Sequence, residues 1–192
     1  MLDRLYARAL KLAASRHALP ALAAVAFAES SFFPLPPDLL LIPMILARPR
    51  RAFLLAGVCT LASVTGGFLG YAIGYFLFAA IGRPLLEFYQ AMGHYEALKA
   101  AFAEWGVWII ILKGLTPIPY KLVTIASGVV HFNLAAFAFA SLVSRSLRFF
   151  LLAALLWRFG EPMRAFIERR LILVTSLFAV ALVGGFAALR YL

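Results

Sequence analysis

Charged residues are scarce in this chain, and acidic residues are the scarcest. Asp and Glu together number 8 of 192 residues, Lys and Arg number 18, and 14% of the chain is charged. A soluble domain is about a quarter charged and about half apolar. Here 65% of the residues are hydrophobic and the mean hydropathy is +0.96. The composition therefore excludes an extended soluble enzyme domain and indicates that the chain resides in lipid.

Residues that hold metals or act as nucleophiles are also few. The single cysteine, Cys59, cannot form an internal disulfide, and it is expected to pack against lipid or core. His17, His94 and His131 have no metal-ligand neighbour at helical spacing. The serine-hydrolase, zinc-protease and phosphate-loop patterns are missing. We therefore expect no enzymatic activity, no metal and no cofactor. A lipid phosphatase would need a nucleophile and a base that the sequence does not offer.

The net charge of +10 points to a membrane surface rather than to nucleic acid. A nucleic-acid-binding chain carries a basic stripe interleaved with exposed polar residues, and none is present here. In a membrane protein, the same excess usually places basic loops beside anionic lipid on the cytoplasmic side. No nucleic-acid partner is expected.

Three apolar segments, residues 52–82, 134–157 and 171–191, reach the roughly 20 residues that a transmembrane helix needs. Residues 2–16 carry basic residues over a helical pattern and predict an amphipathic helix on the membrane surface. Residues 83–104 predict one or two amphipathic helices on the outer surface, broken near Gly93. No cleavable signal peptide is expected, and residues 1–192 are predicted to form a single membrane domain.

Two further apolar segments, residues 18–47 and 105–131, are interrupted by prolines near the middle. Each half has about 10–15 residues, too few to cross about 30 Å of hydrocarbon, and a proline cluster leaves carbonyl groups that lipid cannot satisfy. Both segments are predicted to be re-entrant helical hairpins, with a kinked full span as the alternative. The predicted turns contain Pro34, Pro36 and Pro37 in the first hairpin and Pro117 and Pro119 in the second.

The distribution of basic residues orients this arrangement. If both hairpins return to their own side, eleven Lys and Arg residues lie on the N-terminal side and three lie on the other side. By the positive-inside rule, the N-terminus is then cytoplasmic and the C-terminus outside. The predicted fold is an all-α integral membrane protein with two oppositely oriented re-entrant hairpins, about three transmembrane helices and surface amphipathic helices.

The two hairpins form an inverted repeat with opposite charges. Glu29 and Asp38, nine residues apart, flank the prolines of the first hairpin, and Lys113 and Lys121, eight apart, flank those of the second. Broken helices of this kind bind cargo near the midplane of transporters, where a charge is a functional hypothesis by default. Two more bases lie three residues apart on the 134–157 helix and share a face. The predicted substrate- or ion-binding residues are Glu29, Asp38, Lys113, Lys121, Arg145 and Arg148.

Two acids facing four bases leave a surplus of positive charge, which suits an anionic phosphate headgroup. The alternative is structural: Glu29–Lys113 and Asp38–Lys121 could be ion pairs that hold the hairpin tips together, and Arg145 could be a counter-ion. A glycine face on the 52–82 helix lets another helix approach closely, which permits a homodimer without requiring one. The glycine face consists of Gly66, Gly70 and Gly74.

Three motifs, residues 29–38, 116–121 and 144–150, resemble the DedA family of bacterial inner-membrane proteins, specifically its YqaA-like branch. This group is also called the VTT-domain or SNARE-associated family, and the resemblance covers about residues 20–160. It implies two inward-pointing re-entrant hairpins plus spanning helices in the bacterial inner (cytoplasmic) membrane. It also implies movement of lipids between leaflets, including phospholipids and polyprenyl phosphates such as undecaprenyl phosphate, with relatives that act as scramblases. Coupling to the proton-motive force has been proposed for the family.

Carried onto this chain, the resemblance assigns Glu29 and Asp38 to the acidic positions and Arg145 and Arg148 to the arginine pair. Lys113 and Lys121 stand in the second hairpin, where the better-known branch has arginines. A lysine is a point charge without the bidentate fork of an arginine, so this departure bears on which substrate is bound.

The resulting functional prediction is a flippase or scramblase for a phosphate-headed lipid. Protonation of Glu29 or Asp38 would release a salt bridge and switch access. One alternative is a proton- or ion-coupled antiporter of small solutes, in which the same acids carry the ion. Another is a non-transporting protein that organises the membrane and whose charges are structural.

Overall fold

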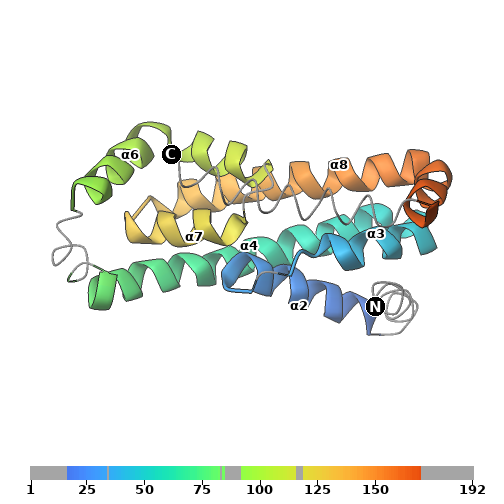
Figure 1. Ribbon diagram of the computed structural model, residues 1–192, viewed down its shortest axis with the longest axis horizontal. Coiled ribbons are helices and arrows are strands. Elements are labelled where there is room, and N and C mark those ends of the chain that lie inside the picture. Colours follow the sequence, from blue (N-terminus) through green and yellow to red (C-terminus); the bar gives the residue numbers. More distant parts are fainter. Residues whose placement is uncertain (1–16, 34, 83, 85–91, 116–118, 170–192) are drawn as a thin grey trace.

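The structure, a computed structural model, describes residues 17–33, 35–82, 84, 92–115 and 119–169. Within these ranges the chain is helical and contains no strand. Figure 1 shows an elongated bundle built on two long helices that lie side by side, α4 and α8. The α-helices are α2 (Ala18–Ser31), α3 (Asp38–Ala47), α4 (Ala52–Leu77), α6 (Met92–Leu115), α7 (Tyr120–Val129) and α8 (Leu134–Arg169).

The two long helices have the length and composition of membrane spans. The apolar segment Pro49–Leu77 has 29 residues and a mean hydropathy of 1.9, and Leu134–Gly160 has 27 residues and 1.6. At 1.5 Å per residue each is about 40 Å long, more than the roughly 30 Å hydrocarbon core. A π-helix, Phe78–Gly82, follows α4, and α8 has non-helical backbone at Phe159. The predicted helices at residues 2–16 and 171–191 lie outside the described residues.

The other four helices form two hairpins, α2 with α3 and α6 with α7, that point toward each other along the bundle. Figure 1 shows α2 running to the middle of the bundle and α3 returning to the same end, while the second half of α6 and α7 do the same from the opposite end. α2 has 14 residues and α3 has 10, about 21 Å and 15 Å. Neither is long enough to cross a bilayer, in keeping with the sequence-based expectation for residues 18–47.

Of the described prolines of the hairpin turns, Pro37 and Pro119 directly precede helices, and Pro36 lies in the non-helical segment before Pro37. Pro37 precedes α3, and its carbonyl accepts hydrogen bonds from the backbone N–H groups of Leu40 and Leu41 at 3.0 and 2.9 Å. Pro119 likewise precedes α7, and its carbonyl accepts the N–H of Leu122 at 3.0 Å. Proline is tolerated at a helix start because its missing N–H has no intrahelical partner there. Pro34 and Pro117 lie outside the described residues.

The structure corrects the predicted boundary between the outer-surface helices and the second hairpin. α6 is a single helix from Met92 to Leu115, so the helix continues through residues 104–105, and it begins one residue before Gly93. The sequence changes there from amphipathic to apolar, but it contains no proline and is rich in good helix formers. The polarity of a helix face determines whether it favours water or lipid, but a change of polarity does not end the helix.

The glycine face of α4 is covered within the chain. A Cβ at Gly66 would collide with the backbone of Phe27 in α2, and one at Gly74 would collide with the carbonyl of Ile125 in α7. The two hairpins therefore pack on α4 at backbone contact, as small residues allow between membrane helices. The close helix approach expected at this face therefore occurs within the chain, to α2 and α7, and the possible homodimer stays a prediction.

The outward faces of the long helices remain apolar. Leu61 and Phe76 of α4 and Phe139 and Leu151 of α8 are each more than half exposed. Apolar side chains at such exposure suit contact with lipid tails. Cys59, in contrast, is fully buried in the core between α2, α3, α4 and α8.

Candidate functional site

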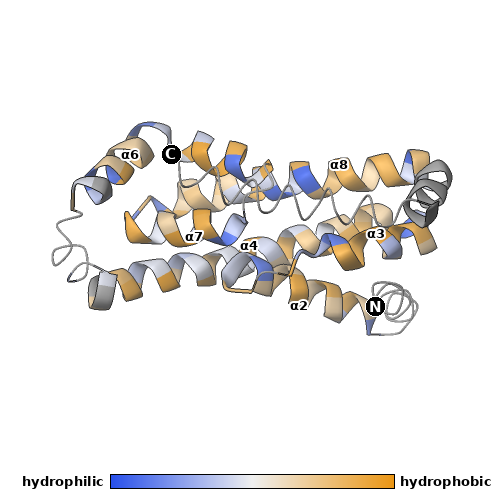
Figure 2. Cartoon of the chain, viewed as in Figure 1, coloured by the Kyte–Doolittle hydropathy of each residue, from blue (hydrophilic) through white to orange (hydrophobic). Residues whose placement is uncertain are grey.

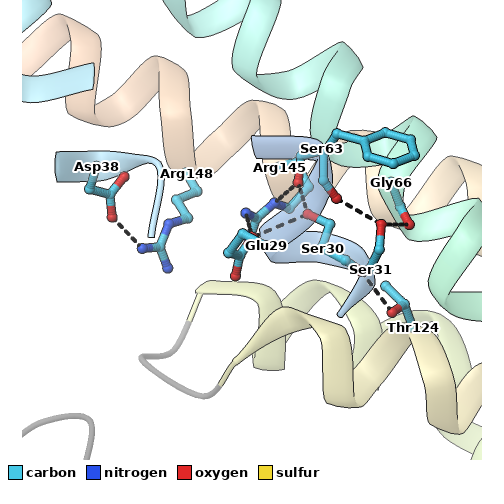
Figure 3. Close-up of polar contacts among 10 residues, drawn as sticks. Glu29, Ser30, Ser31, Asp38, Ser63, Gly66, Thr124, Arg145 and Arg148 are labelled. Carbon is cyan, nitrogen blue, oxygen red and sulfur yellow. Dashed lines mark hydrogen bonds and ion pairs between the residues drawn. The ribbon is translucent and has the colours of Figure 1, made fainter. Parts of the chain in front are cut away.

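The polar residues gather at the middle of the bundle, where the hairpin tips meet the two long helices. Figure 2 shows hydrophilic stretches of α2, α7 and α8 near this level, flanked by apolar ribbon. Figure 3 shows the side chains there, in a row from Asp38 and Arg148 through Arg145 and Glu29 to Thr124.

Glu29, in the last turn of α2, forms an ion pair with Arg145 of α8. Nη2 of Arg145 lies 3.0 Å from Oε2 of Glu29, and the arginine side chain is only 2% exposed. Its Nε donates a hydrogen bond of 2.7 Å to Oγ of Ser63 in α4. One guanidinium therefore joins three helices.

Aromatic rings hold the same guanidinium. Its central carbon lies 4.5 Å from the ring centroid of Tyr120, the first residue of α7, and 4.8 Å from that of Phe149 in α8. Both rings are buried. Such cation–π contacts strengthen when water is excluded, so they help to compensate Arg145 for its burial. Sequence reasoning did not identify either ring as part of the site.

Small hydroxyl side chains complete the contacts at the end of α2. Oγ of Ser30 lies 2.5 Å from Oγ of Ser63, and Oγ of Ser31 donates to the carbonyl of Gly66 at 2.8 Å. Thr124 of α7 donates to the carbonyl of Ser30 at 3.0 Å. Sequence reasoning considered the serines only as nucleophiles and missed this role. A usable signal was present, since Ser63 lies on the same helix face as Gly66 and Gly70.

Asp38, the first residue of α3, pairs with Arg148 of α8. Its Oδ2 accepts a 2.6 Å hydrogen bond from Nη2 of Arg148, and the two side chains are 16% and 27% exposed. The other carboxylate oxygen, Oδ1, is buried and makes no hydrogen bond with any residue that the structure describes. The second pair is thus more open and less completely bonded than the first.

The lysines of the second hairpin lie differently from the structural alternative drawn from the sequence. That alternative paired Glu29 with Lys113 and Asp38 with Lys121, whereas the structure pairs the two carboxylates with the arginines of α8. Lys121 instead directs Nζ toward the carbonyl oxygen of Phe32 at 3.4 Å, across the two hairpin tips. Lys113 lies in the last turn of α6 and is partly buried.

The site is built from ion pairs and hydroxyl groups. In the described ranges no three His, Cys, Asp or Glu side chains come together as a metal site would require. Two carboxylates and two arginines at mid-bundle can exchange salt-bridge partners, accept or release protons, and offer N–H donors to an anion.

These features define a helical membrane protein with two candidate spans and two opposed short hairpins that carry charges between them. The family profile of the VTT domain matches residues 37–158, more than half of the chain. A protein of Haemophilus influenzae is 33% identical over 183 residues, covering 95% of each chain. A protein of Histophilus somni is 36% identical over 168 residues, covering 85% of this chain and 87% of its own length. Both relatives carry the description "uncharacterized".

The chain belongs to the VTT-domain family, which is the DedA family of membrane proteins. Transport is the function generally ascribed to this family. No solved structure matches the chain. The matched range includes Asp38, Lys113, Lys121 and the two arginines of α8, while Glu29 precedes it.

Proposed function

We propose that this protein moves phosphate-headed lipids, such as phospholipids or polyprenyl phosphates, between the leaflets of the bacterial inner membrane. The observation that carries the proposal is the pair of carboxylate–arginine contacts, Glu29–Arg145 and Asp38–Arg148, at the level where the hairpin tips meet. Buried ionisable groups are costly in lipid, and in membrane proteins they mark transport pathways.

Charge balance supports an anionic cargo. The two carboxylates offset the two arginines, so Lys113 and Lys121 contribute the surplus positive charge of this region. Lys121 reaches the first hairpin at its tip. An amphipathic cargo needs apolar surface beside these charges, and the tip provides it, because Phe32 and Phe33 are about half exposed. A lipid headgroup could approach the polar groups while its tails stay on this apolar surface.

The proposal includes a membrane placement. Hairpins α2–α3 and α6–α7 enter the bilayer from opposite sides and return, while α4 and α8 cross. The N-terminal side is cytoplasmic because the exposed Arg48, Arg50 and Arg51 lie at the end of the bundle where α3 and α4 meet. Protonation of Glu29 or Asp38 weakens its arginine pair and thereby couples lipid movement to a proton gradient.

A leaflet-resolved assay tests the function. The purified protein is reconstituted into liposomes that contain a headgroup-labelled phospholipid, and a membrane-impermeant reductant bleaches the label in the outer leaflet. We expect bleaching to extend to the inner-leaflet lipid, and Arg148→Ala to slow it about tenfold or more, the factor that corresponds to about 1.4 kcal/mol. In a parallel arm, a polyprenyl phosphate replaces the phospholipid and an external phosphatase reports its arrival.

Three outcomes contradict the proposal. Bleaching that stops at the outer leaflet in both lipid arms would exclude lipid movement. Dissipation of an imposed pH gradient without lipid movement would favour an ion-coupled antiporter. A folded protein that moves neither lipids nor protons would favour a membrane-organising role. Gly57→Ala serves as the matched control, because no atom lies within 4 Å of a Cβ added there.

A further inference from the structure

The two carboxylate–arginine pairs differ in their surroundings. Arg145 is 2% exposed, whereas Arg148, one turn further along α8, is 27% exposed. The residues one turn before Arg145 and one turn after it, Ser141 and Phe149, are fully buried. Leu151, one turn after Arg148, is 56% exposed. Arg148 therefore borders the lipid-facing surface of α8, and Arg145 does not.

The contacts of Arg145 hold its side chain in one position between the helices. Nε bonds to Ser63 and Nη2 to Glu29, and the rings of Tyr120 and Phe149 lie close to the guanidinium. Separating the pair would leave each buried charge without an opposite charge beside it, which is strongly destabilising. A headgroup could reach Arg145 only if α2, α4, α7 and α8 came apart.

The bonding of Arg148 leaves it able to exchange partners. Its contact with Asp38 is a single hydrogen bond, Nη2 to Oδ2, whereas a guanidinium carries five N–H donors in a fork. On the other side of the pair, Oδ1 of Asp38 is buried and lacks a hydrogen bond from any described residue. An unsatisfied buried oxygen costs free energy, so this pair is less stable than a bidentate one.

Resting on the function proposed above, we propose that the two carboxylate–arginine pairs have different roles, one in positioning and one in binding. Glu29–Arg145 positions the tip of the first hairpin permanently. Arg148 binds the phosphate headgroup, and Asp38 competes with the phosphate for the same guanidinium. The lipid tails lie along the exposed Leu39 and Leu151, which adjoin this pair in sequence and on the helix face.

A binding experiment distinguishes these separate roles from a site in which both carboxylate–arginine pairs bind the headgroup. Farnesyl phosphate is the probe, uncharged farnesol is its control, and affinity and melting temperature are measured on the purified protein in detergent. Asp38→Asn is expected to bind farnesyl phosphate about tenfold more tightly than the wild type, because a neutral amide competes less well for Arg148 than a carboxylate does. Arg148→Lys is expected to bind about tenfold less tightly, with a melting temperature near that of the wild type, because it keeps the charge but loses the fork.

The first pair provides the contrast. Glu29→Gln and Arg145→Lys are expected to lower the melting temperature, and neither should bind the probe more tightly than the wild type. The proposal is overturned if Asp38→Asn binds no more tightly than the wild type, or if Arg145→Lys loses binding at an unchanged melting temperature. If Asp38→Asn cannot be purified, the affinity and melting temperature of Arg148→Lys test the proposal without it. A wild-type protein that binds farnesyl phosphate no better than farnesol would instead contradict the proposed function itself.

Discussion

Glu29 and Arg145 stand 116 residues apart in the sequence, and Oε2 of one lies 3.0 Å from Nη2 of the other. The contact joins the end of a short hairpin helix, α2, to the middle of a candidate membrane-spanning helix, α8. Both partners are largely withdrawn from the surface, so each depends on the other for charge compensation. The pair therefore couples the position of the first hairpin to the bundle.

This coupling predicts a characteristic double-mutant cycle. Arg145→Met leaves the Glu29 carboxylate buried without its partner and is expected to lower the free energy of unfolding by about 3–5 kcal/mol. Replacing Glu29 by Gln in the same chain removes the unpaired carboxylate charge and should recover much of the lost free energy of unfolding. Denaturant unfolding in detergent micelles measures both. A double variant whose loss equals the sum of the two single losses would show that the residues do not interact.

The hydroxyl of Ser63 predicts a smaller, localised effect. Ser63→Ala removes the acceptor of Arg145 Nε and the partner of Ser30, and it is expected to cost about 1–3 kcal/mol, because a buried donor loses its bond. Thr65→Ala is the matched control, since the exposed Thr65 bonds only to carbonyls of its own helix. The same unfolding measurement applies, and equal effects of the two substitutions would contradict the role of Ser63.

The close approach of α2 to α4 predicts opposite outcomes for two glycine substitutions. Gly66→Ala places a Cβ against the backbone of Phe27, so the helices must separate, at a cost of about 1–3 kcal/mol. Gly57→Ala meets no atom within 4 Å, and it should leave stability unchanged or raise it by up to about 1 kcal/mol through helix propensity. Thermal unfolding of the two variants in one detergent compares them. A stable Gly66→Ala protein would refute the tight packing.

The re-entrant placement proposed above predicts which residues share a side of the membrane. Cys59 is buried and should contribute little background to cysteine labelling. We expect His17→Cys and Arg50→Cys to react with an impermeant maleimide from one side, because the first hairpin returns to its starting side in this placement. Glu96→Cys and Asn133→Cys should react from the other side. All four side chains are exposed. His17 directly precedes α2, and the other three lie in loops or on helix surfaces.

The labelling result has a clear alternative. If the first hairpin crossed the bilayer completely, positions 17 and 50 would react from opposite sides. The same comparison of positions 96 and 133 tests the second hairpin. Reaction of position 50 from the periplasmic side of whole cells would reverse the proposed orientation.

Much of the architecture could be predicted from residue patterns. Proline clusters and short apolar halves predicted the hairpin of residues 18–47, and α2 and α3 lie within that range. Hydropathy alone marked α4 and the apolar part of α8 as long enough to span. The boundary at residue 105 was wrong because a change of polarity does not interrupt a helix, and α6 runs through it.

The candidate site could be predicted only as a set of residues. Charges at membrane depth are costly wherever they occur, so the sequence by itself determined that Glu29, Asp38, Arg145 and Arg148 need partners. Which partners they have depends on how the helices pack, and the charge spacing in the sequence left both the lysines and the arginines open as partners. Tertiary structure placed α8 beside both acids, set Ser63 and Tyr120 around one arginine, and left the other partly open. The physical reason is that burial and hydrogen-bond geometry arise from contacts between segments far apart in the chain, which local periodicity does not encode.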